Sequence, residues 1–282
     1  MNFFRSTWSI ALYTWREGIR KKTLLGFLIL SILVIFGSTF MTAFMAAPQR
    51  AVDLGESTVE ADVQSKLIKD ICVSAITIFG VLITIFISAS VVPQEMDNKV
   101  IYTVLSKPVS RFQYLLGKFA GVQLIVLVNL LLMTLLFFAA LWIRESVIPT
   151  LILWSALLTY FQFLIVSAFT FAISCTSTSS VLPTIGGLFI YITGNLTEYL
   201  NDVSARVSES TNAVDYYIGM LAYGLYRMLP NLRDFDLKDQ ILHLAPNDPP
   251  ADAMIPQLLL AGSVYALAGY VLAYVLFRRR EL

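Results

Sequence analysis

The chain has 282 residues, of which 57% are hydrophobic and only 14% are charged. A soluble domain carries about 25% charged residues, so this composition excludes an ordinary soluble domain and indicates a helical membrane protein. The formal net charge is +1, and we expect no nucleic-acid partner.

Residues 2–22 are expected to form an amphipathic helix that lies on the membrane instead of crossing it. Its apolar residues recur every three or four positions, and arginines lie beside them. The apolar stripe consists of Phe4, Trp8, Leu12, Trp15 and Ile19. A Trp-containing stripe flanked by Arg is typical of an interfacial helix. The first long apolar run begins only at Leu24, so we expect no cleavable signal peptide.

Six apolar runs follow, and each is long enough to predict a transmembrane helix. They cover about residues 24–46, 71–92, 119–142, 150–174, 181–200 and 254–277. The fifth contains Pro183 and several glycines, so it is short and breakable. The predicted fold is therefore an all-α polytopic membrane protein, with residues 1–282 forming a single transmembrane domain.

Residues 93–118 form a polar loop between the second and third runs. Within it, Asn98–Ser106 reads as an amphipathic helix about 13 Å long, capped by Asn98 and stopped by Pro108. Its apolar side needs a protein partner or the ends of the spans. Arg111 and Lys118 are expected to reach lipid headgroups. The alternative is an ordinary positive-inside loop with an interfacial helix.

The segment 201–253 is the longest polar region. Tyr217, Leu221, Leu225 and Met228 share one face there, which predicts a second interfacial helix.

Basic residues predict the orientation, because cytoplasmic loops are enriched in Lys and Arg. Six spans place both termini and the loop 93–118 on one side, with 12 basic and 4 acidic residues. The other side has 8 basic and 15 acidic residues. Both termini are therefore expected in the cytoplasm, and the segment 201–253 outside it.

Several kinds of chemistry are not expected in this chain. Gly117-Lys118 lacks the rest of a phosphate-binding loop, and no catalytic constellation stands out. His243 is the single histidine, and a lone histidine near one carboxylate is weak evidence for a metal site. Cys72 and Cys175 are expected near opposite membrane faces, where they cannot form a disulfide.

The predicted spans contain almost no charge, and Gln123, Asn129 and Gln162 are their notable polar residues. Ion-coupled transporters keep carboxylates at mid-membrane, so any transport here is expected to be driven from outside the chain. Asn129 is interpreted as an interhelical hydrogen bond or as part of a substrate path, and we favour the first.

The loop 93–118 resembles the first cytoplasmic loop of ABC-type exporter permeases of the type-2 superfamily. In those permeases a coupling helix follows a Glu, and a Leu-Pro-x-Ser-Arg-like turn and Gly-Lys come after it. The matching residues are Glu95, Ile101, Leu105, Pro108, Ser110, Arg111, Gly117 and Lys118. Lys99-Val100 departs from the common Gly-Thr pair. The N-terminal elbow helix of those permeases is matched by Phe4 to Arg20. The layout, with a large outer segment before the sixth span, is similar to that of permeases that help mature nitrous oxide reductase.

The resemblance implies a permease subunit that pairs with a second copy and docks a cytoplasmic ABC ATPase through its coupling helix. ATP and Mg would be bound by that partner, and this chain would hold no cofactor and have no enzyme activity. The expected docking residues are Glu95, Asp97, Ile101, Leu105, Pro108, Ser110 and Arg111. The expected location is the inner (cytoplasmic) membrane, in contact with lipid. An extracytoplasmic accessory protein is a further candidate partner.

Two other functions remain open from the residues alone. One is an ATP-independent membrane scaffold or assembly factor. The other is a membrane enzyme that acts at the outer loops. The substrate is not predicted.

Overall fold

The computed structural model describes residues 3–49, 57–98, 110–145, 151–197, 199, 202, 213–228, 230–236 and 255–280. Throughout these residues the regular structure is helical. The helices are α1 (Phe3–Ile19), α2 (Lys22–Gln49), α3 (Ser57–Asp97), α5 (Arg111–Glu145), α6 (Leu151–Thr176), α7 (Val181–Asn195), α9 (Ala213–Met228), the short 3₁₀ helix η1 (Arg233–Phe235) and α11 (Ile255–Arg278). The predicted all-α class is therefore confirmed for the described residues.

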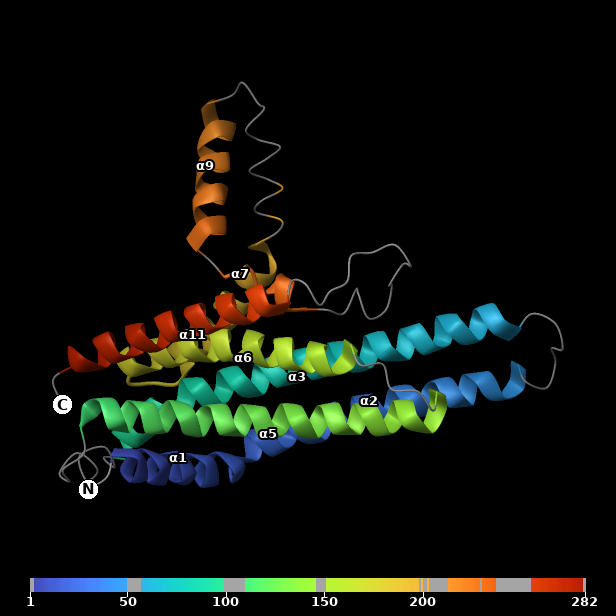
Figure 1. Ribbon diagram of the computed structural model, residues 1–282, viewed down its shortest axis with the longest axis horizontal. Helices are drawn as coiled ribbons and strands as arrows, with labels where there is room; N and C mark the ends of the chain where they lie inside the picture. Colours follow the sequence, from blue (N-terminus) through green and yellow to red (C-terminus); the bar gives the residue numbers. More distant parts are fainter. Residues whose placement is uncertain are drawn as a thin grey trace.

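The long helices lie side by side along one axis, and α9 stands across that axis (Figure 1). The start of α1 and the end of α11 lie at the same end of the bundle (Figure 1). We call this end of the bundle the terminal end. The predicted helix within the segment 201–253 is present as α9, with Tyr217 and Leu221 exposed on it.

Four of the described helices are long and apolar enough to cross a membrane. The candidate spans are Asp70–Asp97, Arg111–Ala139, Leu153–Thr176 and Ile255–Arg278. Two shorter apolar helical stretches, Leu25–Gly37 and Val181–Asn195, fall in the other two predicted runs. The described residues thus support a multi-pass membrane protein.

Helices α3 and α5 are both longer than the apolar runs they contain. Helix α3 begins at Ser57, in the predicted polar loop, and continues through Pro93 to Asp97. Helix α5 begins at Arg111, eight residues before the predicted span. At 1.5 Å per residue these helices are about 60 and 50 Å long, whereas the hydrocarbon core is about 30 Å thick. Both helices therefore continue beyond their apolar runs into polar sequence, because helical hydrogen bonding does not require apolar side chains.

Helix α6 lies at the centre of the bundle, where it contacts α3, α5, α7 and α11. Small residues allow close packing there. Gly269 of α11 faces Ala168 of α6, and Gly187 of α7 faces Thr170 of α6. The glycines that led us to expect a breakable fifth span are thus contact points, and α7 is unbroken from Val181 to Asn195.

The outward faces of the bundle are apolar. Helix α7 exposes Leu182, Ile185 and Phe189, and α11 exposes Leu260, Val264 and Leu267. Continuous apolar faces on long helices fit contact with lipid.

Helix α1 lies alongside α5 and runs in the same direction (Figure 1). A Cβ atom built on Gly117 would lie 2.8 Å from the carbonyl oxygen of Thr7, and one on Gly121 would lie 2.7 Å from that of Ala11. Farther along both helices, Gly18 faces Ile125. Because these contacts extend from Thr7 to Gly18 of α1, the helix follows α5 instead of crossing it steeply.

The expected helix at residues 2–22 is therefore present as α1, and it packs lengthwise against α5. Its position on the membrane surface stays a prediction. The small side of α1 fills the groove that the glycines of α5 leave open. The apolar stripe lies beside this small side. Trp15 of the stripe packs against the core, while Phe4 and Trp8 are 84% and 59% exposed. The exposed part of the stripe is available for contact with lipid.

Candidate functional site

The predicted coupling helix connects α3 to α5. Helix α3 ends at Asp97, and α5 begins at Arg111. Ile101, Leu105 and Pro108 lie in residues 99–109, outside the described residues, so their docking role remains a prediction. Asp97 and Asn98, which lead into this segment, are exposed.

Ser110 caps the first turn of α5. The backbone N–H of Gln113 donates to Ser110 Oγ at 3.2 Å, and the backbone N–H of Ser110 donates to Gln113 Oε1 at 3.0 Å. This reciprocal pair is a capping box, which satisfies two backbone donors at the helix start. Ser110, predicted as a docking residue, thus fixes where α5 begins.

Two arginines connect helix ends at the terminal end of the bundle. Arg111 Nη1 donates to the carbonyl oxygens of Arg278 and Arg280, at 3.3 and 3.2 Å. Arg280 Nη1 donates to the carbonyl oxygens of Cys175 and Ser177, at 2.9 and 3.2 Å. Cations are favourable at helix C-termini, where carbonyl groups lack helical partners. Arg111 thereby binds the start of α5 to the end of α11, and Arg280 binds the end of α11 to the end of α6.

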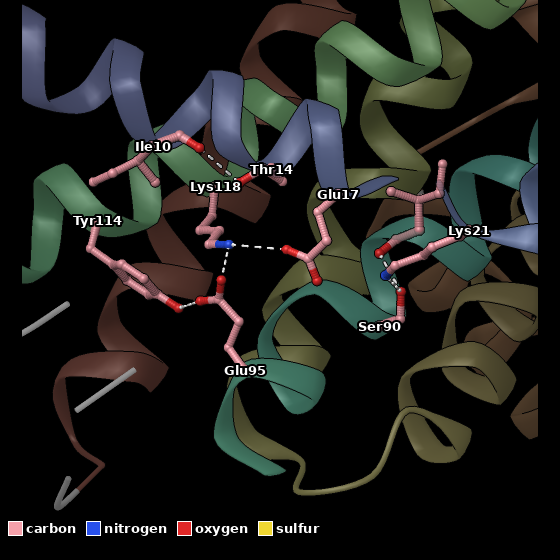
Figure 2. A network of polar contacts seen from close by, with 9 residues as sticks. Ile10, Thr14, Glu17, Lys21, Ser90, Glu95, Tyr114 and Lys118 are labelled. Carbon is pink, nitrogen blue, oxygen red and sulfur yellow. Dashed lines mark hydrogen bonds and ion pairs between the residues drawn. The ribbon is translucent and has the colours of Figure 1, made fainter. Parts of the chain in front are cut away.

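Glu95 is buried, although we predicted that it offers charge to a partner. The residue is 3% exposed, and its two carboxylate oxygens accept hydrogen bonds from Tyr114 Oη and Lys118 Nζ (Figure 2). Glu95 lies in the last turn of α3, whereas Tyr114 and Lys118 lie in the first turns of α5. In this conformation the Glu95 carboxylate binds its own chain.

Lys118 lies between two carboxylates. It is 1% exposed, and its Nζ atom is 4.0 Å from Glu17 Oε2 of α1 as well as paired with Glu95 (Figure 2). The ammonium group also lies 5.2 Å from the centre of the Tyr13 ring. Our prediction that Lys118 reaches lipid headgroups is wrong, because its charge is paired inside the protein. We call Glu17, Glu95, Tyr114 and Lys118 the charged junction.

Lys21 forms a contact beside the charged junction. Its Nζ atom donates to Ser90 Oγ at 2.8 Å, which connects the turn between α1 and α2 to α3 (Figure 2). Burial lowers the pKa of Lys21, and Glu17 acts in the opposite direction.

The middle of the bundle holds uncharged polar side chains. Gln123 Nε2 of α5 donates to Ser167 Oγ of α6, and Gln162 Nε2 donates to the carbonyl oxygen of Leu232 at 3.2 Å. Asn129 is buried, and neither polar atom of its side chain has a hydrogen-bond partner among the described residues. The interhelical hydrogen bond that we favoured for Asn129 is thus made by Gln123 instead.

The charged junction has the chemistry of a structural connection. Each carboxylate oxygen of Glu95 is hydrogen-bonded, and no side chain of the four is a free nucleophile beside a base. The described residues include no group of three or more His, Cys, Asp or Glu placed to hold a metal ion. Cys72 and Cys175 are buried and are not joined in a disulfide, and His243 lies outside the described residues.

Tyr114 and Glu17 were not predicted as parts of the site, and Lys118 was assigned to the lipid surface. One signal could have indicated that Tyr114 and Lys118 act together. Tyr114 and Lys118 are spaced i, i+4, so they share a face once the helix is known to begin at Arg111. That face points toward Glu95, which precedes the connecting segment.

The fold and its apolar faces define a multi-pass membrane protein whose charged side chains gather where residues 99–109 begin and end. Residues 8–282 match the ABC-2 family transporter protein family. The chain belongs to this family, and it is a permease component of an ABC transporter. No curated protein matches the chain in sequence.

Proposed function

We propose that this chain is the membrane subunit of an ABC exporter that is driven by ATP hydrolysis on a separate cytoplasmic ATPase. The observation that carries this proposal is the family match, which covers nearly the whole chain. The sequence has no phosphate-binding loop of its own. The nucleotide and its Mg are therefore assigned to the partner subunit.

Residues 99–109 form the docking element in this proposal. Its apolar side contains Val100, Ile101, Val104 and Leu105. The helices on both sides of the element meet at the charged junction, and Arg111 holds the start of α5 to α11. An element with anchored ends transfers a push to the helices that hold it.

Two copies of this chain pair in the proposed exporter, each with one ATPase subunit. Both termini and the docking element face the cytoplasm, and the complex resides in the cytoplasmic membrane. Export is the direction inferred from the resemblance of the loop 93–118 to that of exporter permeases. An accessory protein outside the cytoplasm would meet the segment 201–253.

The test is co-purification of the tagged chain with co-expressed ABC ATPase subunits from the same organism. Leu105→Asp should abolish co-purification, because it places a charge on the apolar side of the docking helix. Ser106→Asp is the matched control. It adds the same charge on the opposite side of that helix and should leave the complex intact. An unchanged complex with Leu105→Asp would refute the docking assignment.

A wild-type chain that never co-purifies with an ATPase, while its membrane insertion is normal, would contradict the exporter proposal. That result would favour the scaffold function instead.

A further inference from the structure

We infer that Lys118 is a positioning residue for energy coupling: it joins both ends of residues 99–109 to α1, so that these parts move together. This inference rests on the proposed function, because it assumes that an ATPase moves that segment. It adds that the displacement is delivered to α1.

The first step is the position of the ion pair. Glu95 lies two residues before the end of α3, and Lys118 lies in the second turn of α5. Their contact therefore connects the helix that enters the docking element to the helix that leaves it. Tyr114 donates to the second oxygen of the same carboxylate, which fixes its orientation. The end of α3 and the start of α5, on either side of residues 99–109, are thus bonded to each other.

The second step is burial. The Glu95 and Lys118 side chains are 4% and 2% exposed, so little water can replace either partner if the pair separates. A buried charge that loses its partner is strongly unfavourable, which makes separation of the two helix ends costly. A force on one side of the docking element must therefore displace both helix ends.

The third step is the connection to α1. Glu17 of α1 approaches Lys118 Nζ to 4.0 Å. The residues on either side of Lys118 along α5 include Gly117 and Gly121, and both face the backbone of α1 closely. Charge and close packing thus act at the same place, and α1 follows the first turns of α5.

Movement of the docking element, the charged junction and α1 as one unit would reach the apolar surface of α1. The exposed stripe of α1, with Phe4 and Trp8, is the apolar surface that moves with the unit. Displacement of the docking element would shift this stripe relative to the surrounding lipid. A purely structural ion pair predicts no such dependence of α1 on the ATPase.

The experiment measures the responses of the docking element and of α1 with two separate fluorescent probes. Cys72 and Cys175 are first replaced by Ala, and a single cysteine is placed either at Ser106, in the docking element, or at Ser9, which is exposed on α1. An environment-sensitive bimane label then reports the change on adding ATP and vanadate to the purified complex with its ATPase. In the otherwise unaltered chain we expect both probes to respond.

The decisive variant is Glu95→Met combined with Lys118→Met, which removes both charges and leaves no unpaired one. Replacing a buried ion pair by apolar residues is often neutral for folding, so this variant should assemble. We expect the response at Ser106 to persist and that at Ser9 to fall about threefold or more. Lys22→Met, which removes an exposed lysine, is the control and should change neither response.

Each outcome has one meaning. If the probe at Ser9 responds equally with and without the charge pair, while Ser106 still responds, the inference about Lys118 is wrong. If Ser106 does not respond even in the unaltered complex, the proposed docking function fails, and the inference fails with it. If the double variant does not assemble, Glu95→Gln with Lys118→Met is compared by the same two probes and the same criterion.

Discussion

The buried polar side chains of the charged junction have hydrogen-bond partners, whereas some polar atoms in the middle of the bundle have none among the described residues. At the junction, Lys118 has two carboxylates nearby, and both oxygens of Glu95 accept hydrogen bonds. In the middle, Gln123 uses its nitrogen, while its oxygen has no partner among the described residues. Asn129 has none for either atom.

This difference separates a part of the molecule that resists rearrangement from one that permits it. Satisfied buried networks specify one geometry, because breaking any bond leaves a buried charge without a partner. An amide with unused hydrogen-bonding capacity loses little when its neighbours shift, and it can gain a partner. In the proposed function, the charged junction would pass on force without rearranging, and the middle of the bundle could change its packing.

The largest effect is expected from leaving one charge of the junction without its partner. Lys118→Ala should destabilise the protein by about 3–5 kcal/mol, because it leaves Glu95 buried and unpaired. The double variant Glu95→Met with Lys118→Met should lie much closer to the unaltered protein. Thermal unfolding of the purified chain in detergent measures both. Equal losses in the two variants would show that the ion pair itself stabilises the junction, because the double variant keeps the side-chain volume and leaves no charge unpaired.

The second prediction concerns the groove that holds α1. Gly121→Leu should destabilise the protein by about 1–3 kcal/mol, because a Cβ there already meets Ala11 and Thr14. Gly26→Ala is the control, since a Cβ at Gly26 meets nothing within 4 Å. The same unfolding measurement should show that variant unchanged or slightly more stable. A harmless Gly121→Leu would mean that α1 is not held in this groove.

The third prediction concerns the start of α5. Ser110→Ala should cost about 1 kcal/mol through loss of the capping box. Amide hydrogen exchange, measured by mass spectrometry on peptides from the first turn of α5, should increase. Ser110→Asp keeps an N-capping acceptor and should retain the slow exchange. Exchange that is unaffected by Ser110→Ala would show that Arg111 alone anchors this helix end.

The helices were predictable from the sequence because apolar run length is a strong signal. The runs at 71–92, 119–142, 150–174 and 254–277 all lie in helices that can span a membrane. The boundaries of α3 and α5 were not predictable from the same signal. An apolar run ends where polar residues begin, whereas both helices continue into the polar residues. Ser110 and Gln113 mark the true start of α5, and their spacing is readable as a capping box.

The contacts of the candidate site were harder to predict, because a sequence does not state which helices meet. The small residues Thr7, Ala11, Thr14 and Gly18 share one side of α1 at helical spacing, but only packing shows that Gly117 and Gly121 face them. Glu95 and Lys118 were visible as charges at the two ends of a loop. Their pairing follows once α3 extends to Asp97 and α5 begins at Arg111.

The smallest changes in stability are expected in the middle of the bundle, where only one of two substitutions should destabilise the protein. Asn129→Leu exchanges a buried amide without hydrogen-bond partners for an apolar group of similar volume, so stability should stay constant or rise by up to about 1 kcal/mol. Gln123→Leu should instead lower stability by roughly 0.6 kcal/mol, because it removes the bond to Ser167.

Detergent unfolding of these two variants, together with the ATP-dependent probe response, tests the contrast. A loss of stability in Asn129→Leu would show that the amide has a partner after all and that the middle is as tightly specified as the junction. Unchanged stability with a lost response would instead show that the Asn129 side chain takes part in the ATP-dependent rearrangement. Unchanged stability with an unchanged response is the expected result, because a side chain without hydrogen-bond partners does not resist the movement of the helices around it.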